Sequence, residues 1–273
     1  MSGRALDDGL RLLGLALIVA VIGFLIVPIL VTVLMAFDAR PYLGPLPPPA
    51  YSLRWFRQFF SDDYFLRGLA TSAELAVASV AITVIAGVAT AVALDRMPAR
   101  GREALTSLFL SPLIVPPVVT GLALLLFLAR LGVYDGFARL LCGHVIITVP
   151  YTIRATLAGI AGIDRSLTEA ALSLGANERR AFRDVTLPLA RTGIVTGALF
   201  AFAVSLDDVS VSIMLTDAKT FTLPIALISS MRADFNLTIA AASVMLMLLT
   251  LALILVLDRF VGLNRAVGQG VFR

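Results

Sequence analysis

Six segments of this chain are apolar and long enough to cross a lipid bilayer as α-helices. They cover residues 12–37, 69–94, 105–129, 139–160, 193–215 and 238–257. About twenty apolar residues in a helix match the hydrocarbon thickness, and a helix satisfies its own backbone hydrogen bonds in lipid. Only 15% of the residues are charged, against roughly a quarter in soluble domains. We therefore predict an all-α polytopic membrane protein with six transmembrane helices in a single domain, residues 1–273.

The basic residues predict which side of the membrane each end of the chain occupies. An even number of spans leaves both termini on one side, and cytoplasmic connectors carry an excess of Lys and Arg. Cytoplasmic termini place fourteen basic residues inside: Arg4, Arg11, Arg96, Arg100, Arg102, Arg154, Arg165, Arg179, Arg180, Arg183, Arg191, Arg259, Arg265 and Arg273. The other eight then lie outside: Arg40, Arg54, Arg57, Arg67, Arg130, Arg139, Lys219 and Arg232. The first run is too long for a signal-peptide core, so we interpret it as an uncleaved span.

Several functional classes are disfavoured by residue types that are scarce. With a single cysteine, Cys142, and a single histidine, His144, an internal disulfide or a histidine-pair metal motif is ruled out. The basic residues form no block or stripe, which disfavours nucleic-acid binding. A Walker A loop requires Gly-Lys-Ser/Thr, and the only lysine, Lys219, follows Asp217 and Ala218. We expect no catalytic residue, metal ligand or cofactor in this chain, so any ATP hydrolysis belongs to another polypeptide.

Two proline-containing regions suggest departures from regular helix. The predicted external connector, residues 38–68, has five prolines and then an aromatic and arginine-rich stretch from Tyr51 to Phe60, which is typical of an amphipathic anchor at the membrane surface. The third span contains Pro112, Pro116 and Pro117. We predict a kink or break there. Such a break either lines a pathway or only serves packing, and both alternatives remain open.

The longest predicted cytoplasmic connector has signals for two short helices. Ser166 and Glu169 have the spacing of a capping box. Gly175 follows as a left-handed helix stop, and Asn177 suits the cap of a second helix. Pro188 marks the point where this second helix should give way to the fifth span. We therefore expect a helix, a tight turn and a helix.

This connector, residues 161–190, resembles the EAA loop of ABC-importer permeases. The resemblance comprises Glu169-Ala-Ala-Leu-Ser-Leu-Gly175, a spacer of nine residues, and Val185-Thr-Leu-Pro188. In that family the loop forms the coupling helix that seats in a groove of the ATPase subunit. The residues that the resemblance assigns to ATPase coupling are Glu169, Ala170, Ala171, Gly175, Leu187 and Pro188. The implied fold is that of a type I ABC importer permease.

Acidic residues lie within two of the predicted spans. Counted from Gly193, the fifth span is only about 21 Å long at Leu206, short of the roughly 30 Å hydrocarbon thickness. We therefore predict that its helix continues through Asp207 and Asp208, and Glu74 lies five residues inside the second span. Acids at that depth are functional-site candidates. Either they bind a cationic solute, or the span tilts or breaks and leaves them at a wet rim.

The region around these acids resembles the spermidine/putrescine-type permeases. The similar stretches are Val204-Ser-Leu-Asp-Asp-Val-Ser-Val-Ser212, Thr222-Leu-Pro224 and His144-Val-Ile-Ile-Thr-Val-Pro150. The resemblance implies that the solute is a polyamine or a similar cation, with Asp207, Asp208 and Glu74 on the substrate path. Close relatives carry other small organic solutes, so an amino-acid-like or opine-like substrate stays open.

The resemblance also implies an assembly in the bacterial inner membrane. The expected partners are an ABC ATPase dimer that binds ATP and Mg, a second permease subunit in a heterodimer, a periplasmic solute-binding protein and membrane lipid. ATP would shift the permeases between inward-facing and outward-facing packings. Two other functional classes fit the sequence less well. A stand-alone secondary carrier would fit the acids but not the capped cytoplasmic loop, and an intramembrane enzyme would need an activated nucleophile that the sequence does not offer.

Overall fold

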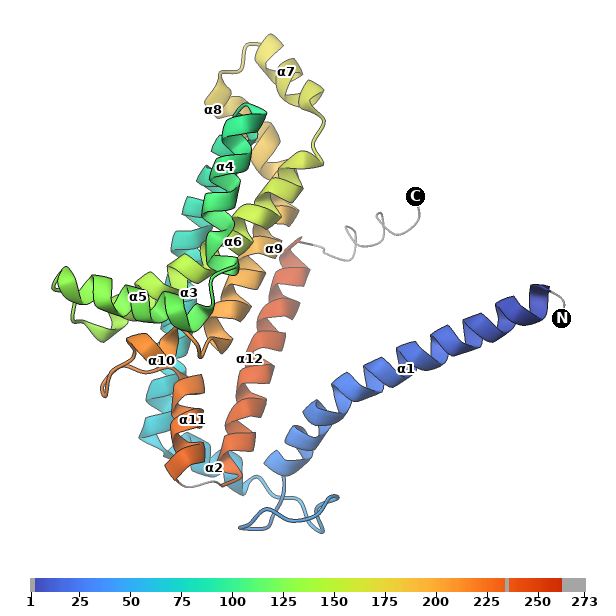
Figure 1. Ribbon diagram of the computed structural model, residues 1–273, viewed down its shortest axis with the longest axis vertical. Helices are drawn as coiled ribbons and strands as arrows, with labels where there is room; N and C mark the ends of the chain where they lie inside the picture. Colours follow the sequence, from blue (N-terminus) through green and yellow to red (C-terminus); the bar gives the residue numbers. More distant parts are fainter. Residues whose placement is uncertain (1–2, 234–235, 262–273) are drawn as a thin grey trace. The chain divides into compact units, whose positions relative to one another are not determined.

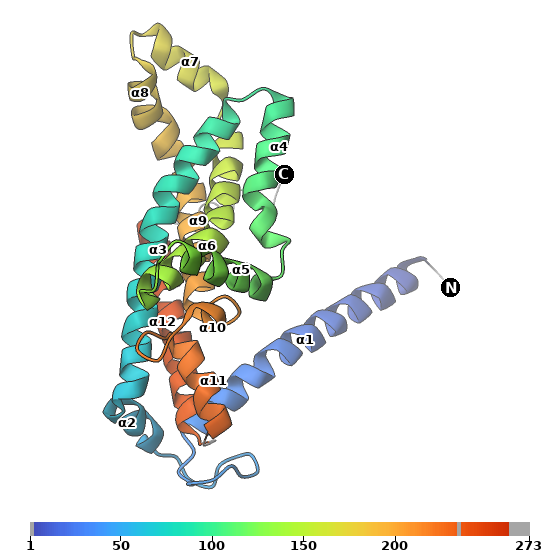
Figure 2. The same cartoon turned by 60° about the vertical axis from the view of Figure 1, so that its left-hand side comes forward.

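The computed structural model describes residues 3–233 and 236–261, and their regular structure is helical (Figures 1 and 2). The helices along the chain are α1 (Gly3–Ala36), α2 (Arg54–Ser61), α3 (Asp63–Asp95), α4 (Ala99–Leu110), η1 (Ser111–Leu113), α5 (Pro117–Arg130), α6 (Gly136–Ala161), α7 (Arg165–Ser173), α8 (Glu178–Ala181), η2 (Phe182–Thr186), α9 (Leu187–Asp207), α10 (Ser212–Leu215), α11 (Leu223–Ala233) and α12 (Thr238–Val261). Of the predicted cytoplasmic residues, Arg265 and Arg273 lie outside the described part of the chain, as does the C-terminus.

The number of apolar helices confirms the predicted fold class. Within the described residues, five helices are long and apolar enough to cross a membrane, and a bent pair of helices makes a sixth. The bent pair runs from Ala99 to Leu113 and from Pro117 to Arg130, with an angle of 96° between its two parts. The predicted break in the third span is therefore confirmed. Proline restricts the residue before it and removes a backbone donor, which explains why the helix stops at this point.

The contacts divide the chain into two compact units. The first unit comprises residues 1–63 and 229–247. Its core contains Ala36 at the end of α1, Trp55 of α2, and Leu237, Ala241 and Val244 in and just before α12. Trp55 is only 3% exposed, whereas Phe60 is 52% exposed. The stretch expected as a membrane-surface anchor is thus a short helix whose tryptophan packs within the protein.

The connector between α1 and α2 is closed by short-range contacts. Asp38 and Tyr51 form an isolated antiparallel bridge, and the amide of Ser52 donates to the carbonyl of Phe37 at 2.7 Å. The buried carboxylate of Asp38 accepts from Arg40 Nε at 3.0 Å. Hydrogen bonds from the Arg40 side chain hold the pKa of Asp38 below its ordinary value. The proline-rich connector is therefore a defined loop.

The second unit comprises residues 64–228 and 248–273, of which the structure describes residues up to 261. Its long helices α3, α6 and α9 lie side by side in both views (Figures 1 and 2). Glycines allow α6 and α9 to approach closely. A Cβ added at Gly193 would lie 2.5 Å from the carbonyl oxygen of Ala155, and one at Gly197 would lie 2.9 Å from Cα of Thr152. Such small residues are typical of helix contacts in membranes, where packing drives association.

The fifth span corrects one prediction. We expected its helix to begin near 193 and to continue through Asp207 and Asp208 to about 215. Instead α9 begins at Leu187 with a proline in its first turn and ends at Asp207. Its 21 residues give a helix of about 31 Å, so it reaches the thickness of the hydrocarbon core without the residues beyond. The prediction failed because Pro188, taken as the end of the preceding helix, is tolerated in the first turn of this one.

Candidate functional site

The end of α9 is the point where the structure breaks the fifth span. Asp208 has an extended backbone, with φ −66° and ψ 128°, and the chain resumes as helix at Ser212. The Asp208 carboxylate caps the new helix. Its Oδ2 accepts from the amide of Ser212 at 2.8 Å, from the Ser212 hydroxyl at 2.9 Å and from the amide of Val211 at 3.1 Å. Asp208 thereby satisfies backbone donors that the break leaves free.

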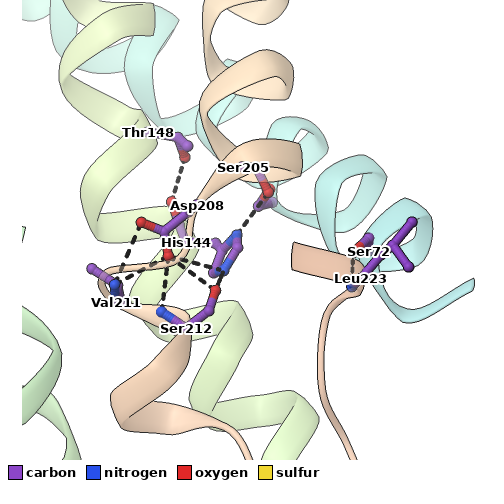
Figure 3. A network of polar contacts seen from close by, with 9 residues as sticks. Ser72, His144, Thr148, Ser205, Asp208, Val211, Ser212 and Leu223 are labelled. Atoms are coloured by element: carbon purple, nitrogen blue, oxygen red, sulfur yellow. Dashed lines mark hydrogen bonds and ion pairs between the residues drawn. The ribbon is translucent and has the colours of Figure 1, made fainter. Parts of the chain in front are cut away.

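His144 of α6 connects the two sides of this break (Figure 3). Its ring is fully buried. Nδ1 lies 2.8 Å from the hydroxyl of Ser205 in α9, and Nε2 lies 2.9 Å from the hydroxyl of Ser212 in α10. Nε2 is also 4.0 Å from the Asp208 carboxylate. Every polar atom of the imidazole therefore has a partner, as burial requires.

The carboxylate also sets the direction of the hydrogen bonds. A carboxylate only accepts, so the single hydroxyl proton of Ser212 points to Asp208. The Ser212 oxygen then accepts from His144, which places a ring proton on Nε2; in the neutral tautomer Nδ1 is then an acceptor for the Ser205 hydroxyl. Ser79 of α3 lies 3.1 Å from the Ser205 hydroxyl. The result is a chain of hydrogen bonds, centred on the imidazole, that joins α3, α6, α9 and α10.

The acidic residues predicted for the substrate path occupy different environments. The Asp208 side chain is 9% exposed and is hydrogen-bonded as described above. Asp207, at the last position of α9, is exposed, and so is Glu74 on α3. The structure therefore does not bring the three acids into one cluster. It makes Asp208 part of the buried polar network and leaves Asp207 and Glu74 on the surface of the chain.

Four members of the network, namely Ser79, His144, Ser205 and Ser212, were not predicted as site residues. Ser205 and Ser212 flank the two aspartates in the sequence, and His144 is the only histidine. An ionisable residue within a span is by itself a signal of function, so His144 could have been singled out. Its pairing with two serines 61 and 68 positions away carries no local sequence signal.

The α7–α8 loop, residues 161–190, has the predicted sequence of helix, turn and helix. Gly175 has φ +91°, which confirms the predicted left-handed stop. The amide of Gly175 donates to Leu172 at 3.0 Å and that of Ala176 donates to Ala171 at 3.1 Å, which is the Schellman arrangement. Asn177 Oδ1 accepts from the amide of Arg180 at 3.0 Å, so the predicted cap of the second helix is also confirmed.

Two details of this loop differ from the prediction. The first helix is capped by Asp164, whose carboxylate accepts from the amide of Ser166 at 2.9 Å; the predicted capping box was wrong. Both residue types are good caps, and the earlier one starts the helix. Pro188 does not end the second helix either, because α8 passes through a π-helical stretch, η2, directly into α9. The helical path is therefore continuous into the fifth span.

The surface of this loop is open. Both views show α7 and α8 at one end of the α3, α6 and α9 bundle (Figures 1 and 2). Glu169, Ala170, Leu187 and Pro188 are exposed, and Leu174 is 89% exposed. Ala171 is half-buried. Because Asp164 supplies the cap, the Glu169 carboxylate is not needed for it. Exposed apolar side chains at such a position are typical of a protein contact.

Comparison with known proteins identifies related sequences over most of the chain. Residues 83–266 match the family described as "Binding-protein-dependent transport system inner membrane component". The spermidine/putrescine transport system permease protein PotC of Haemophilus influenzae is 31% identical over 78% of this chain and 82% of its own length. The putrescine transport system permease protein PotI of Escherichia coli is 29% identical over 82% of each chain.

Solved structures share the fold at lower sequence identity. A chain of a bacterial ABC transporter involved in the import of the acidic polysaccharide alginate aligns with a TM-score of 0.74 at 17% identity, over 94% of this chain and 98% of that one. A chain of the MetNI methionine ABC transporter aligns with a TM-score of 0.62 at 20% identity, over 72% of this chain and 94% of that one. These likenesses establish the type I ABC importer permease fold.

Proposed function

We propose that this chain, which belongs to the family of binding-protein-dependent transport system inner membrane components, forms half of the translocation path for a polyamine or a similar small organic cation. As a member of this family it is a membrane permease subunit of an importer. The proposal adds the class of solute, the energy source and the residues involved. Each of these additions has its own support.

The proposed substrate class is supported by the names of the relatives together with one acidic residue, Asp207, at the break in the fifth span. Relatives named as spermidine/putrescine or putrescine permeases align over 78–99% of the chain. The chain also has an exposed carboxylate, Asp207, where the fifth span breaks. Broken helices in transporters line the substrate path because irregular backbone is tolerated only beside protein or water. A carboxylate at such a break suits an ammonium group.

We propose that the α7–α8 loop couples the path to an ABC ATPase. In this proposal Glu169, Ala170 and Ala171 of α7, the turn at Gly175, and the Leu187-Pro188 pair form the surface that meets the ATPase. The support is exposure and shape: the loop carries exposed apolar side chains on a capped helix with a fixed turn. ATP and Mg would bind to the ATPase dimer.

The same proposal covers orientation and partners. Cytoplasmic termini put the α7–α8 loop on the ATPase side, which agrees with the excess of arginines assigned to the inside. The other half of the path would come from a second permease subunit in a heterodimer, with lipid around both. A periplasmic solute-binding protein would deliver the cation from outside.

Reconstitution tests the proposed function directly. The chain is co-expressed with the proposed ABC ATPase, second permease and binding protein, and the complex is placed in proteoliposomes. We expect ATP-dependent, saturable uptake of spermidine or putrescine when the binding protein is present. Omission of the ATPase or the binding protein is the control. Uptake of amino acids but not polyamines would overturn the substrate class, and uptake by this chain alone would overturn the ATPase coupling.

A further inference from the structure

We infer that His144 is a positioning residue: it fixes the break between α9 and α10 so that Asp207 presents its carboxylate to the transported cation, whereas Asp208 does not. The inference rests on the proposed function, because it assigns the residue of that path that meets the cation. It is carried by the contacts on the two sides of the break (Figure 3).

Asp208 is already occupied by hydrogen bonds. Its Oδ2 accepts from two backbone amides and one hydroxyl, at 3.1, 2.8 and 2.9 Å. Its Oδ1 lies 3.4 Å from the Val211 amide, and only 9% of the side chain is exposed, which limits access of a solute to either oxygen. An ammonium group that took over Oδ2 would leave those donors without partners in a buried place, which is costly. Asp207 has no such role in the network and is exposed at the end of α9. Of the two neighbouring carboxylates, Asp207 is the one available to a solute.

His144 holds both sides of the break at once. Nδ1 contacts Ser205, which lies two residues before Asp207 in α9, and Nε2 contacts Ser212, the first residue of α10. The backbone that carries Asp207 is thus fixed between two points joined by one rigid ring. If the end of α9 rotated by a few tenths of a helical turn, the Asp207 side chain would point in another direction. The contacts of His144 therefore determine where the Asp207 carboxylate points.

The packing of α10 supports the same role. A Cβ added at Gly143 would lie 2.5 Å from Cδ1 of Leu215 and 2.8 Å from Cγ1 of Val211. The short helix therefore contacts α6 one residue before His144. A helix of four residues has little stability of its own, so its position depends on this contact and on the Ser212 hydrogen bond.

Histidine is suited to this position because a neutral imidazole offers one donor and one acceptor on different edges. Glutamine can reach Ser212 with its amide but loses the rigid second contact. Phenylalanine keeps a ring of similar shape and removes both. Thr156 is the matched control, since it lies in the same helix, is fully buried, and its hydroxyl has no hydrogen-bond partner.

The first test measures the KM for spermidine uptake by the reconstituted complex. We expect His144→Phe to raise the KM about tenfold, His144→Gln to raise it less, and Thr156→Val to leave it within about twofold. Asp207→Asn should raise the KM about tenfold in the native background but less than about twofold in the His144→Phe background, because coupled residues give non-additive effects. Multiplicative effects would overturn the inference. If His144→Phe does not assemble, His144→Gln takes its place in the same cycle.

The second test does not depend on the substrate. Cys142 is exposed and is replaced by serine, and Asp207→Cys is then labelled in the complex with a small cationic thiol reagent. We expect His144→Phe, but not Thr156→Val, to slow labelling at least fivefold, on the order of 1 kcal/mol of activation free energy. Equal labelling rates in both backgrounds would overturn the inference. The expected labelling pattern in a complex that takes up no polyamine would support the positioning role and overturn the proposed substrate.

Discussion

The α7–α8 loop and the break between α9 and α10 are two interruptions of helix in the same unit, and they are built in opposite ways. In the loop, the helix caps are hydrogen bonds between residues a few positions apart, such as Asp164 with Ser166 and Asn177 with Arg180, and the long-range ion pair of Glu178 with Arg96 lies on the exposed surface. The break is held by His144, which lies more than 60 positions from both of its partners. The loop can therefore keep its shape when the bundle changes, whereas the break is part of the bundle.

This difference suits the two proposed roles. A coupling element has to transmit movement between two proteins, and a locally stabilised helix and turn moves as one piece. A site that meets a solute inside a membrane has to be fixed by its surroundings, because unsatisfied polar groups there are costly. Substitutions in the two regions should therefore have different effects. Those in the bundle should change the stability of the protein or the position of the site residues, and those in the loop should reduce the coupling of transport to ATP hydrolysis.

The largest expected effect is on bundle folding, for Gly193→Val. A side chain there would meet the carbonyl oxygen of Ala155 and the backbone of Gly159, neither of which can move aside as a flexible side chain could. We expect a loss of about 3 kcal/mol or more in the free energy of unfolding, the upper end for overpacking, measured as recovery and thermal stability of the purified complex. Gly23→Val, where nothing lies within 4 Å, is the control. Equal stability of the two variants would contradict the close α6–α9 contact.

A large effect on transport, without a loss of stability, is expected for Gly175→Val. A β-branched residue is a poor match for φ +91°, but the added side chain would meet open space, so insertion and bundle stability should survive. We expect ATP-dependent uptake to fall at least about tenfold, that is about 1.4 kcal/mol, while the complex still runs intact on size exclusion.

The matched control is Gly162→Val, at a helix end with φ −82°, where uptake should be normal. Normal substrate-stimulated ATPase activity and uptake in Gly175→Val would count against the coupling role of the loop.

An intermediate effect on stability should distinguish the two aspartates. Asp208→Asn removes the charge from a capping group with three hydrogen bonds, and we expect a loss of about 1–3 kcal/mol, the range for charged hydrogen bonds. Asp207→Asn should leave thermal stability unchanged and act on the KM for the cation. Thermal unfolding and concentration-dependent uptake are measured for both single variants and for the double variant. If both single variants lost the same stability and showed the same change in KM, the assignment of capping to Asp208 and of cation binding to Asp207 would be contradicted.

The smallest effect is expected for the N-terminal cap of α7. Hydrogen bonds from the Ser166 amide and hydroxyl lower the pKa of Asp164. Its capping contribution is therefore present above the ordinary carboxylate pKa of about 3.9 and is lost only as the pH falls through the lower folded value. We expect Asp164→Ala to reduce uptake by less than about twofold, with the same ratio to the native protein from pH 6 to pH 8. Asp164→Ser, which keeps a cap, should behave as the native protein, and a ratio that changes within this pH range would contradict the assignment.

Local chemistry made much of the molecule predictable. Apolar runs of bilayer length predicted the number of segments able to cross a membrane, because lipid offers the backbone no other partner. Pro112, Pro116 and Pro117 predicted the break in the third span, and Gly175 and Asn177 predicted the turn and the cap in the loop, because each of these residues acts on its immediate neighbours. The error in the predicted cap at Ser166 also arose from neighbouring residues, because Asp164, two positions earlier, is an equally good capping residue.

The sequence by itself determined that this chain is a helical membrane protein with six apolar segments of bilayer length and a structured loop, residues 161–190, that resembles the one in ABC-importer permeases. Only the tertiary structure decided that α9 ends at Asp207, that Asp208 caps a new helix, and that the two acids therefore differ. The physical reason is that a helix in a membrane stops where its freed donors and acceptors find better partners. Here Asp208 accepts from the freed amides of Val211 and Ser212, and His144 on another helix holds the hydroxyls of Ser205 and Ser212 on the two sides of the break. No pattern within the span itself encodes the contact with His144.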